Sequence, residues 1–232
     1  MLSVFGLPET LPQGMRRSGG MRSSWAAMGE LLRQKPFMCY VGVQGFTMGG
    51  FFGYVAASPF VLQGMYGLSP KHYSLIFGCN ALSLMFFAFG TARNARRLGE
   101  ARLLRIGNTL RAVACVGVLG VTVVSPTSPV PLLIGLIFMI ALQGMTLPTS
   151  FTIGISAQNV GAGTASGILG VSVFIFGALT SPLVGLAGGG TALPLGIVSA
   201  VTGVASALLG YVGERELKKL RAASGPEAQA HP

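Results

Sequence analysis

The fold of this chain is decided by stretches such as residues 131–153, which read PLLIGLIFMIALQGMTLPTSFTI. This stretch belongs to a longer run, from Ala112 to Gly213, that contains no Asp, Glu, Lys or Arg. Water-soluble domains do not contain uncharged runs of this length. Because one membrane-spanning helix needs about 20 apolar residues, the run must be divided into several membrane passes.

The composition of the whole chain points the same way. Of its 232 residues, 9% are charged and 51% are hydrophobic, and the mean hydropathy is +0.66. A soluble domain would carry roughly 25% charged residues. The net charge of +10 would suggest a nucleic-acid partner in a soluble protein, but here the basic residues flank apolar segments. We therefore expect the lipid bilayer as a partner and no nucleic acid.

Turn-forming residues divide the chain into six apolar segments. The predicted spans are 37–60, 71–92, 103–125, 131–153, 163–187 and 191–212. The predicted breaks are Ser58 to Pro70, an arginine-rich loop, Pro126 to Pro131, Gln158 to Gly163, and the glycines 188–190.

The basic residues form three clusters: before Phe37, within 93–105, and in the tail from 213 onward. Basic residues that flank membrane spans collect on the cytoplasmic side. Two spans separate the first cluster from the second, and four separate the second from the third, so six spans place all three on one side. The sequence predicts an all-α membrane protein, a six-helix bundle with both termini cytoplasmic.

The two ends of the chain differ from the bundle. We predict a cytoplasmic linker over 1–36, the bundle over 37–212, and a partly disordered cytoplasmic tail over 213–232. Within the linker, residues 23–35 place Trp25, Met28, Leu31 and Leu32 on one helical face, which is typical of a helix lying in the membrane interface. A solvated linker with some helical content is the alternative interpretation.

The inventory of reactive residues excludes an enzyme. The chain has no Asp, its two histidines are His72 and His231, and all six Glu lie outside the predicted spans. Hydrolysis at membrane depth requires a nucleophile with a base, or paired carboxylates. The three cysteines have no metal-binding spacing. We therefore expect no catalytic residue, no metal and no cofactor.

Glycines recur at intervals of four residues in two of the spans. Gly45, Gly49 and Gly53 lie in the first span, and Gly163 and Gly167 lie in the fifth. Small residues at this spacing let membrane helices approach closely, which predicts a helix-packing role. Broken transporter helices also use such residues, and this second reading stays open.

Arg111 is the one charged residue that lies well inside a predicted span. It comes six residues after Arg105, so it lies roughly 9 Å deeper along a helix. A charge at the bilayer centre costs about 2.5–3.5 kcal/mol on insertion scales. We favour an interpretation in which its side chain snorkels back to the cytoplasmic headgroups, with a functional site as the alternative.

A series of short motifs resembles one transporter family. Residues 57–63 read ASPFVLQ, 66–70 YGLSP, 73–77 YSLIF and 80–82 NAL, and they are followed by AGTAS at 162–166, GAL at 177–179, SPLVGL at 181–186 and TALP at 191–194. In this order they resemble the bicyclomycin-resistance (Bcr/CflA) family of multidrug efflux proteins, in the major facilitator superfamily. Residues 7–12, LPETLP, are similar to the end of that family's sixth helix and the start of its central loop.

The resemblance implies the six-helix C-terminal half of a major facilitator fold, in the bacterial inner (plasma) membrane. It implies export of small lipophilic, drug-like compounds by proton antiport, with the coupling carboxylates in an N-terminal half. The chain would then work with a separately encoded N-terminal half-transporter or with a second copy of itself. A non-transporting truncated fragment, and a six-helix channel or scaffold, are the alternatives.

The resemblance and the polarity of the spans together select candidate residues. The candidates for a substrate path are Tyr54, Ser58, Asn80, Gln143 and Phe174, and the remnants of the superfamily's cytoplasmic-loop motif are Gly90, Arg97, Gly99 and Arg102. The chain departs from the family at Arg96, where the motif has an acidic residue, and at Val173, where the family usually has Gln.

Overall fold

The computed structural model describes residues 21–124, 127–156, 162–185 and 191–223. Every regular element in these ranges is helical: α2 (Met21–Arg33), α3 (Lys35–Ser58), a π-helical segment η2 (Pro59–Met65), α4 (Pro70–Leu98), α5 (Glu100–Val124), α6 (Val130–Ser156), α7 (Ala162–Gly185) and α8 (Leu193–Ala223). The predicted linker residues 1–20 and the tail from 224 onward lie outside the described ranges.

The described residues contain six helices whose length and apolar composition suit them to cross a membrane. They are α3 continued by η2, then α4, α5, α6, α7 and α8 up to Leu220. This confirms the predicted all-α fold and the number of spans.

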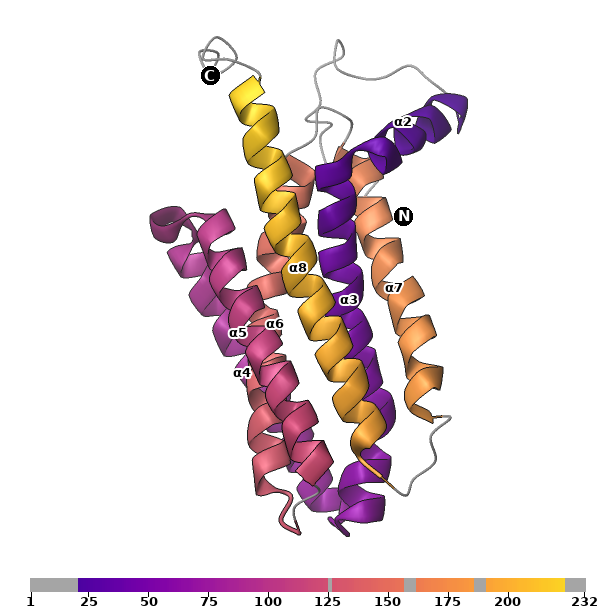
Figure 1. The fold of residues 1–232 in the computed structure, drawn as a ribbon, viewed down its shortest axis with the longest axis vertical. Helices are drawn as coiled ribbons and strands as arrows, with labels where there is room; N and C mark the ends of the chain where they lie inside the picture. Colours follow the sequence, from indigo (N-terminus) through magenta and orange to yellow (C-terminus); the bar gives the residue numbers. More distant parts are fainter. Residues whose placement is uncertain (1–20, 125–126, 157–161, 186–190, 224–232) are drawn as a thin grey trace, which may run out of the picture.

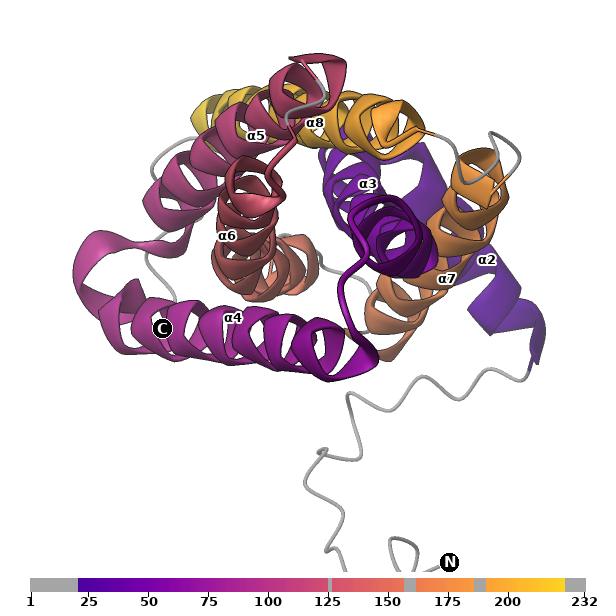
Figure 2. The same cartoon turned by 90° about the horizontal axis from the view of Figure 1, so that it is seen from below.

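The six long helices form one bundle in which α3 and α6 are central (Figure 2). Seen from below, α4 lies along one side, α5 and α8 lie along the opposite side, and α7 packs beside α3. In the most apolar stretch of each helix, 56% of α3 and 50% of α6 is buried, but only 11% of α4. Helix α4 is therefore the span that the rest of the described chain covers least.

Glycines let α3 pack closely against α7. A Cβ atom added at Gly45 would overlap the ring of Phe176 on α7, and one added at Gly49 would lie 3.1 Å from Cγ2 of Thr180. At the same level the Thr180 hydroxyl donates a hydrogen bond of 2.8 Å to the carbonyl oxygen of Gly49. The two backbones are therefore held together by direct contact and by a hydrogen bond.

A second face of α3 packs against α8 in the same way. A Cβ atom at Gly53 would lie 3.0 Å from Val198, and one at Gly50 would lie 2.6 Å from the hydroxyl oxygen of Thr202. The predicted packing glycines 45, 49 and 53 thus all lie at helix contacts in this structure.

Among the described glycines, the one that lies closest to the backbone of another helix is Gly144, where α6 meets α4. A Cβ atom at Gly144 would collide with the carbonyl oxygen of Leu84 and would lie 2.9 Å from the backbone nitrogen of Ala88. Because backbone atoms cannot rotate away as a side chain can, this position requires glycine.

The glycines of α7 that the sequence pattern selected behave differently. A Cβ atom at Gly163 or Gly167 would meet no atom within 4 Å. These two glycines are therefore not at a helix contact among the described residues, unlike Gly177 on the same helix, where a Cβ would overlap the ring of Phe52.

Two predicted breaks are shorter in the structure. The first span, predicted to end at residue 60, continues further, because Pro59 (φ −62°) fits helical geometry and starts the π-helical segment that continues to Met65. The arginine-rich loop is reduced to Gly99, since α4 ends at Leu98 and α5 begins at Glu100. Gly99 has φ +77°, a conformation that favours glycine and lets the chain reverse within one residue.

A helix lies near the N-terminus, and the last helix is longer than the predicted span. Helix α2 covers most of 23–35 and runs across one end of the bundle (Figure 1). Its predicted apolar stripe divides, because Leu31 is fully buried while Trp25 is 64% exposed. Helix α8 continues as far as Ala223, well beyond the predicted limit at 212.

The described segments that carry the three basic clusters lie at one end of the bundle. Helix α2, the α4–α5 connection at Gly99 and the C-terminal end of α8 all lie at the upper end in Figure 1. The segment 127–129 and the end of η2 lie at the opposite end. This arrangement agrees with the parity argument made from the sequence.

Our first prediction concerns the orientation of the bundle. A reporter fused after Lys218 should be cytoplasmic and one inserted at Ser128 should be external, because basic residues near spans are retained in the cytoplasm. Paired phosphatase and fluorescent-protein fusions measure both positions. A cytoplasmic signal at Ser128 would contradict the proposed orientation.

The second prediction concerns the α4–α6 contact. Gly144→Ala should lower the free energy of unfolding by about 1–3 kcal/mol, because the added methyl group must push two backbones apart. Gly163→Ala is the matched control, since its methyl group meets no neighbour and alanine is the better helix former. Thermal unfolding of both variants in detergent makes the comparison, and equal stability of the two would refute the tight contact.

Candidate substrate path

One face of α3 carries a row of polar or sulfur-containing side chains that meets α4 and α6. The row consists of two pairs of residues at helical spacing, Gln44 with Met48 and Tyr54 with Ser58. Gln44 donates hydrogen bonds to the carbonyl oxygen of Leu147 (2.8 Å) and to the hydroxyl of Ser150 (3.0 Å) on α6. The row therefore runs along the seam between the central helices and α4.

Two hydrogen bonds join this row to α4. The side-chain amide of Asn80 donates a bond of 2.7 Å to the Tyr54 hydroxyl, and both side chains are buried. The hydroxyls of Ser58 and Tyr73 lie 3.0 Å apart within hydrogen-bond geometry. Phe77 stacks on Tyr54, with 6.1 Å between ring centroids and 12° between ring planes. The result is a small aromatic and amide cluster between α3 and α4.

A further contact, between Gln143 and Met48, joins α6 to α3. The side-chain amide of Gln143 donates to the sulfur of Met48 at 3.2 Å. Its carbonyl oxygen and that of the Asn80 side chain are buried and have no hydrogen-bond partner among the described residues. Two amide oxygens are thus left as acceptors along one seam.

The structure brings together four of the five predicted path residues. Tyr54, Ser58, Asn80 and Gln143 are all at most 2% exposed and lie in the seam of α3, α4 and α6. Phe174 lies apart from them on α7, is 70% exposed, and its ring centroid is 6.4 Å from that of Phe52. In this structure the four seam residues are closed within the bundle.

Sequence reasoning missed the residues that complete the cluster. Tyr73 and Phe77 precede Asn80 by seven and three residues, so all three share one face of α4. From this spacing, Tyr73 and Phe77 could have been predicted to lie beside Asn80. The role of Met48 had no signal in the sequence, because a methionine in an apolar helix is indistinguishable from a packing residue.

Arg111 is fully buried, so the favoured prediction of a snorkelling side chain is wrong. One guanidinium nitrogen, Nη2, donates a bond of 3.1 Å to the carbonyl oxygen of Thr47 on α3. The other two nitrogens, Nε and Nη1, have no hydrogen-bond partner among the described residues. The side chain points inward from α5, which packs against α8 and α6, and its guanidinium group reaches the backbone of α3.

A buried hydroxyl and amide cluster lies beside Arg111. The hydroxyls of Thr47 and Ser206 lie 3.0 Å apart, and Ser206 donates to the Asn108 side-chain oxygen at 2.9 Å. The Asn108 amide donates in turn to the Ser206 carbonyl oxygen at 2.8 Å. These bonds join α3, α5 and α8 at one level of the bundle.

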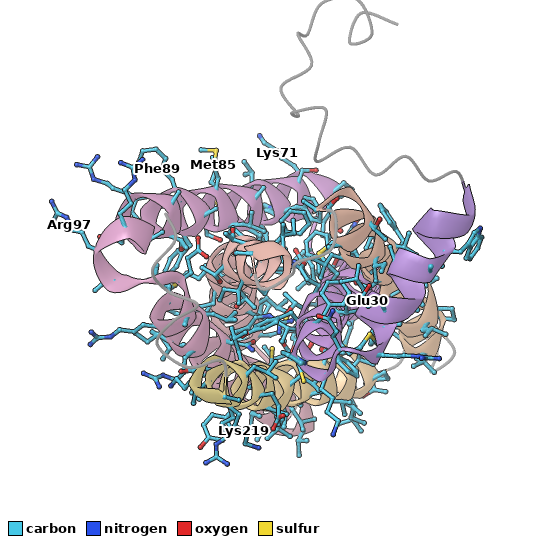
Figure 3. The ribbon with its side chains drawn as sticks, turned by 90° about the horizontal axis from the view of Figure 1, so that it is seen from above. Glu30, Lys71, Met85, Phe89, Arg97 and Lys219 are labelled. Carbon is cyan, nitrogen blue, oxygen red and sulfur yellow. The ribbon has the colours of Figure 1, made fainter. Side chains whose placement is uncertain are left out.

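The predicted remnants of the cytoplasmic-loop motif do not form one cluster. A Cβ at Gly90 would meet no atom, Gly99 forms the one-residue connection, and Arg97 points away from the bundle (Figure 3). Arg102 instead lines a cavity with Arg96. Across the parts of the chain that the structure describes, no three His, Cys, Asp or Glu side chains gather as metal ligands.

Comparison with known proteins identifies the kind of protein that this chain resembles. It is 36% identical over 208 residues to the uncharacterized MFS-type transporter YdgK of Bacillus subtilis, an alignment that covers 90% of this chain and 51% of that protein. It is 25% identical over 189 residues to the bicyclomycin resistance protein homolog of Haemophilus influenzae, covering 81% and 47%. No family model matches the chain.

The chain thus spans about half the length of the curated relatives it matches. It is a multi-pass membrane protein homologous to bacterial transporters of the major facilitator type, and its six spans are consistent with half of that fold.

The third prediction concerns Arg111. Arg111→Met should raise the free energy of unfolding by about 1 kcal/mol, because an apolar side chain of similar length removes a buried charge that has a single hydrogen bond among the described residues. Arg105→Met, at an exposed position on the same helix, is the control and should change stability by less. A marked loss of stability in Arg111→Met would show that the free nitrogens are bonded in the folded protein.

Proposed function

We propose that this chain forms the C-terminal six-helix half of a multidrug efflux transporter that exports small lipophilic compounds by proton antiport across the bacterial inner membrane. The observation that carries the proposal is the homology of 90% of the chain to an MFS-type transporter over 51% of that transporter's length. The second relative is a homologue of a bicyclomycin resistance protein, which favours a drug-like substrate.

The seam of α3, α4 and α6 is the proposed substrate path of this half. Its rings, Tyr54, Tyr73 and Phe77, suit an apolar ligand body, and the free amide oxygens of Asn80 and Gln143 suit one or two donor groups. Because Tyr54 and Asn80 are closed within the bundle, access requires α4 to separate from α3. Phe174, exposed on α7, is proposed as a contact at the mouth of the path.

The proton-coupling group is proposed to lie outside this chain. Antiport requires a titratable group where the alternating cavity reaches both sides of the membrane. The sequence has no Asp, and the Glu residues of the described spans, Glu100, Glu214 and Glu216, lie near the helix ends. A separately encoded N-terminal half could supply a carboxylate, whereas a second copy of this chain would bring the same residues again.

The fourth prediction tests the proposed path. In a complete transporter that carries this half, Asn80→Ala and Tyr54→Ala should each lower drug resistance several-fold, because each removes one partner of the α3–α4 hydrogen bond. Ile197→Ala is the control, since Ile197 is 47% exposed on α8. Resistance is measured by growth in graded drug concentrations after expression is matched. Equal effects of all three variants would show that Asn80 and Tyr54 contribute only to helix packing and do not bind substrate.

The fifth prediction concerns coupling. Proteoliposomes that contain only this chain should not accumulate a fluorescent lipophilic cation uphill when a pH gradient is imposed. Alternating access needs a second bundle, and coupling needs a carboxylate at membrane depth. Accumulation that a protonophore abolishes would contradict this prediction and would assign the coupling group to a residue of this chain.

A further inference from the structure

A cavity of about 700 Å³ opens at the end of the bundle that carries the basic clusters. It lies where the C-terminal ends of α4, α6 and α8 meet the first turns of α5. Its charged lining residues are Arg96, Arg102, Arg105, Lys218, Glu100 and Glu214. Basic groups from three different helices thus face one space.

The charges in this cavity do not cancel. Glu214 pairs with Lys218 at 2.7 Å and with Arg105 at 3.6 Å. Arg96 and Arg102 have no ion pair among the residues that the structure describes, and Glu100 is the remaining carboxylate. Four cationic groups against two carboxylates leave an excess of positive charge that favours an anion.

The backbone adds to this preference. Gly99, Glu100 and Ala101 line the cavity, so the first turn of the 25-residue helix α5 opens onto it. The free N–H groups of a helix N-terminus carry partial positive charge and bind phosphate oxygens. The arginine side chains and the helix end therefore act on the same space.

The surface next to the cavity matches a phospholipid, because it is basic beside the cavity and apolar further along the helix. Arg102, Ile106, Leu110 and Val113 follow one another at intervals of four, four and three residues, so they lie on one face of α5. The three apolar residues are 39%, 50% and 66% exposed. Arg102 and Val113 are separated by about 16 Å along the helix, close to the thickness of one leaflet of the hydrocarbon core.

The geometry points to a binding site for an anionic phospholipid, with its phosphate between Arg96 and Arg102 at the start of α5. Its acyl chains lie along Ile106, Leu110 and Val113. Leu98, Ile153 and Leu217 give the cavity apolar walls that a soluble phosphate compound would not use. The lipid holds the α4–α5 connection against the end of α8, where Glu214 already binds Arg105.

The test is a lipid titration of the purified full chain in detergent. Unfolding is followed by a thiol-reactive fluorophore in a Cys79→Ala background, because Cys39 and Cys115 are buried and free whereas Cys79 is exposed. Dioleoylphosphatidylglycerol should raise the unfolding temperature, and dioleoylphosphatidylcholine should raise it much less. In Arg96→Gln/Arg102→Gln the phosphatidylglycerol concentration that gives half of the effect should rise about tenfold.

The matched control is Arg93→Gln/Arg97→Gln, which removes the same charge from exposed arginines of α4 that do not line the cavity. This variant should respond to phosphatidylglycerol as the unmodified chain does. Equal weakening in both double variants would show diffuse attraction and overturn the site. An equal response to phosphatidylcholine, or to inorganic phosphate alone, would overturn the assignment to an anionic phospholipid.

Discussion

The bundle depends on how closely α3 approaches its neighbours. In lipid the hydrophobic effect does not drive helices together, so dispersion contacts and interhelical hydrogen bonds must do so. Both require short distances, and glycine provides them: Gly45 and Gly49 toward α7, and Gly50 and Gly53 toward α8. The Thr180 hydroxyl can reach the Gly49 carbonyl oxygen only because no side chain separates the two backbones. Close packing at α3 therefore makes the polar contacts of the bundle feasible.

Close packing also determines which polar groups are satisfied. Bilayer lipid offers no hydrogen-bond partners, so each polar side chain must find one within the protein or in a water-filled space. Thr47, Asn108 and Ser206 satisfy one another across three helices. Within the part of the chain that the structure describes, Arg111, at the same level, has one hydrogen bond for its charged group, and the side-chain oxygens of Asn80 and Gln143 in the seam have no partner. Among the described residues, the buried groups of Arg111, Asn80 and Gln143 that have no partner lie on side chains that contact α3, where the proposed substrate path also lies.

The sequence predicted those features that depend on local hydropathy and charge. The number of spans and the gathering of basic clusters at one end follow from residue type along the chain alone. Features that depend on which helix face points inward were not predictable in this way. The sequence allowed an estimate of how deep Arg111 lies in the membrane, but it did not show that its side chain points into the bundle. Snorkelling was therefore expected. Gly144 does not belong to a glycine repeat, so the sequence did not indicate its helix contact. The sequence also did not indicate that the face of α7 with Phe174 is exposed.

Helix α4 shows how the structure and the proposed function are connected. Most of its surface is uncovered, and Met85 and Phe89 point away from the bundle (Figure 3). Its attachment to α3 consists largely of the bonds of Asn80 and Tyr73 to Tyr54 and Ser58. A substrate that enters the proposed path must replace these same bonds, because the groups that would bind it are already paired across the seam. Substrate binding and the release of α4 from α3 would then be one event, and the glycine contact at Gly144, which holds α4 to α6 without side chains, would be the pivot that remains.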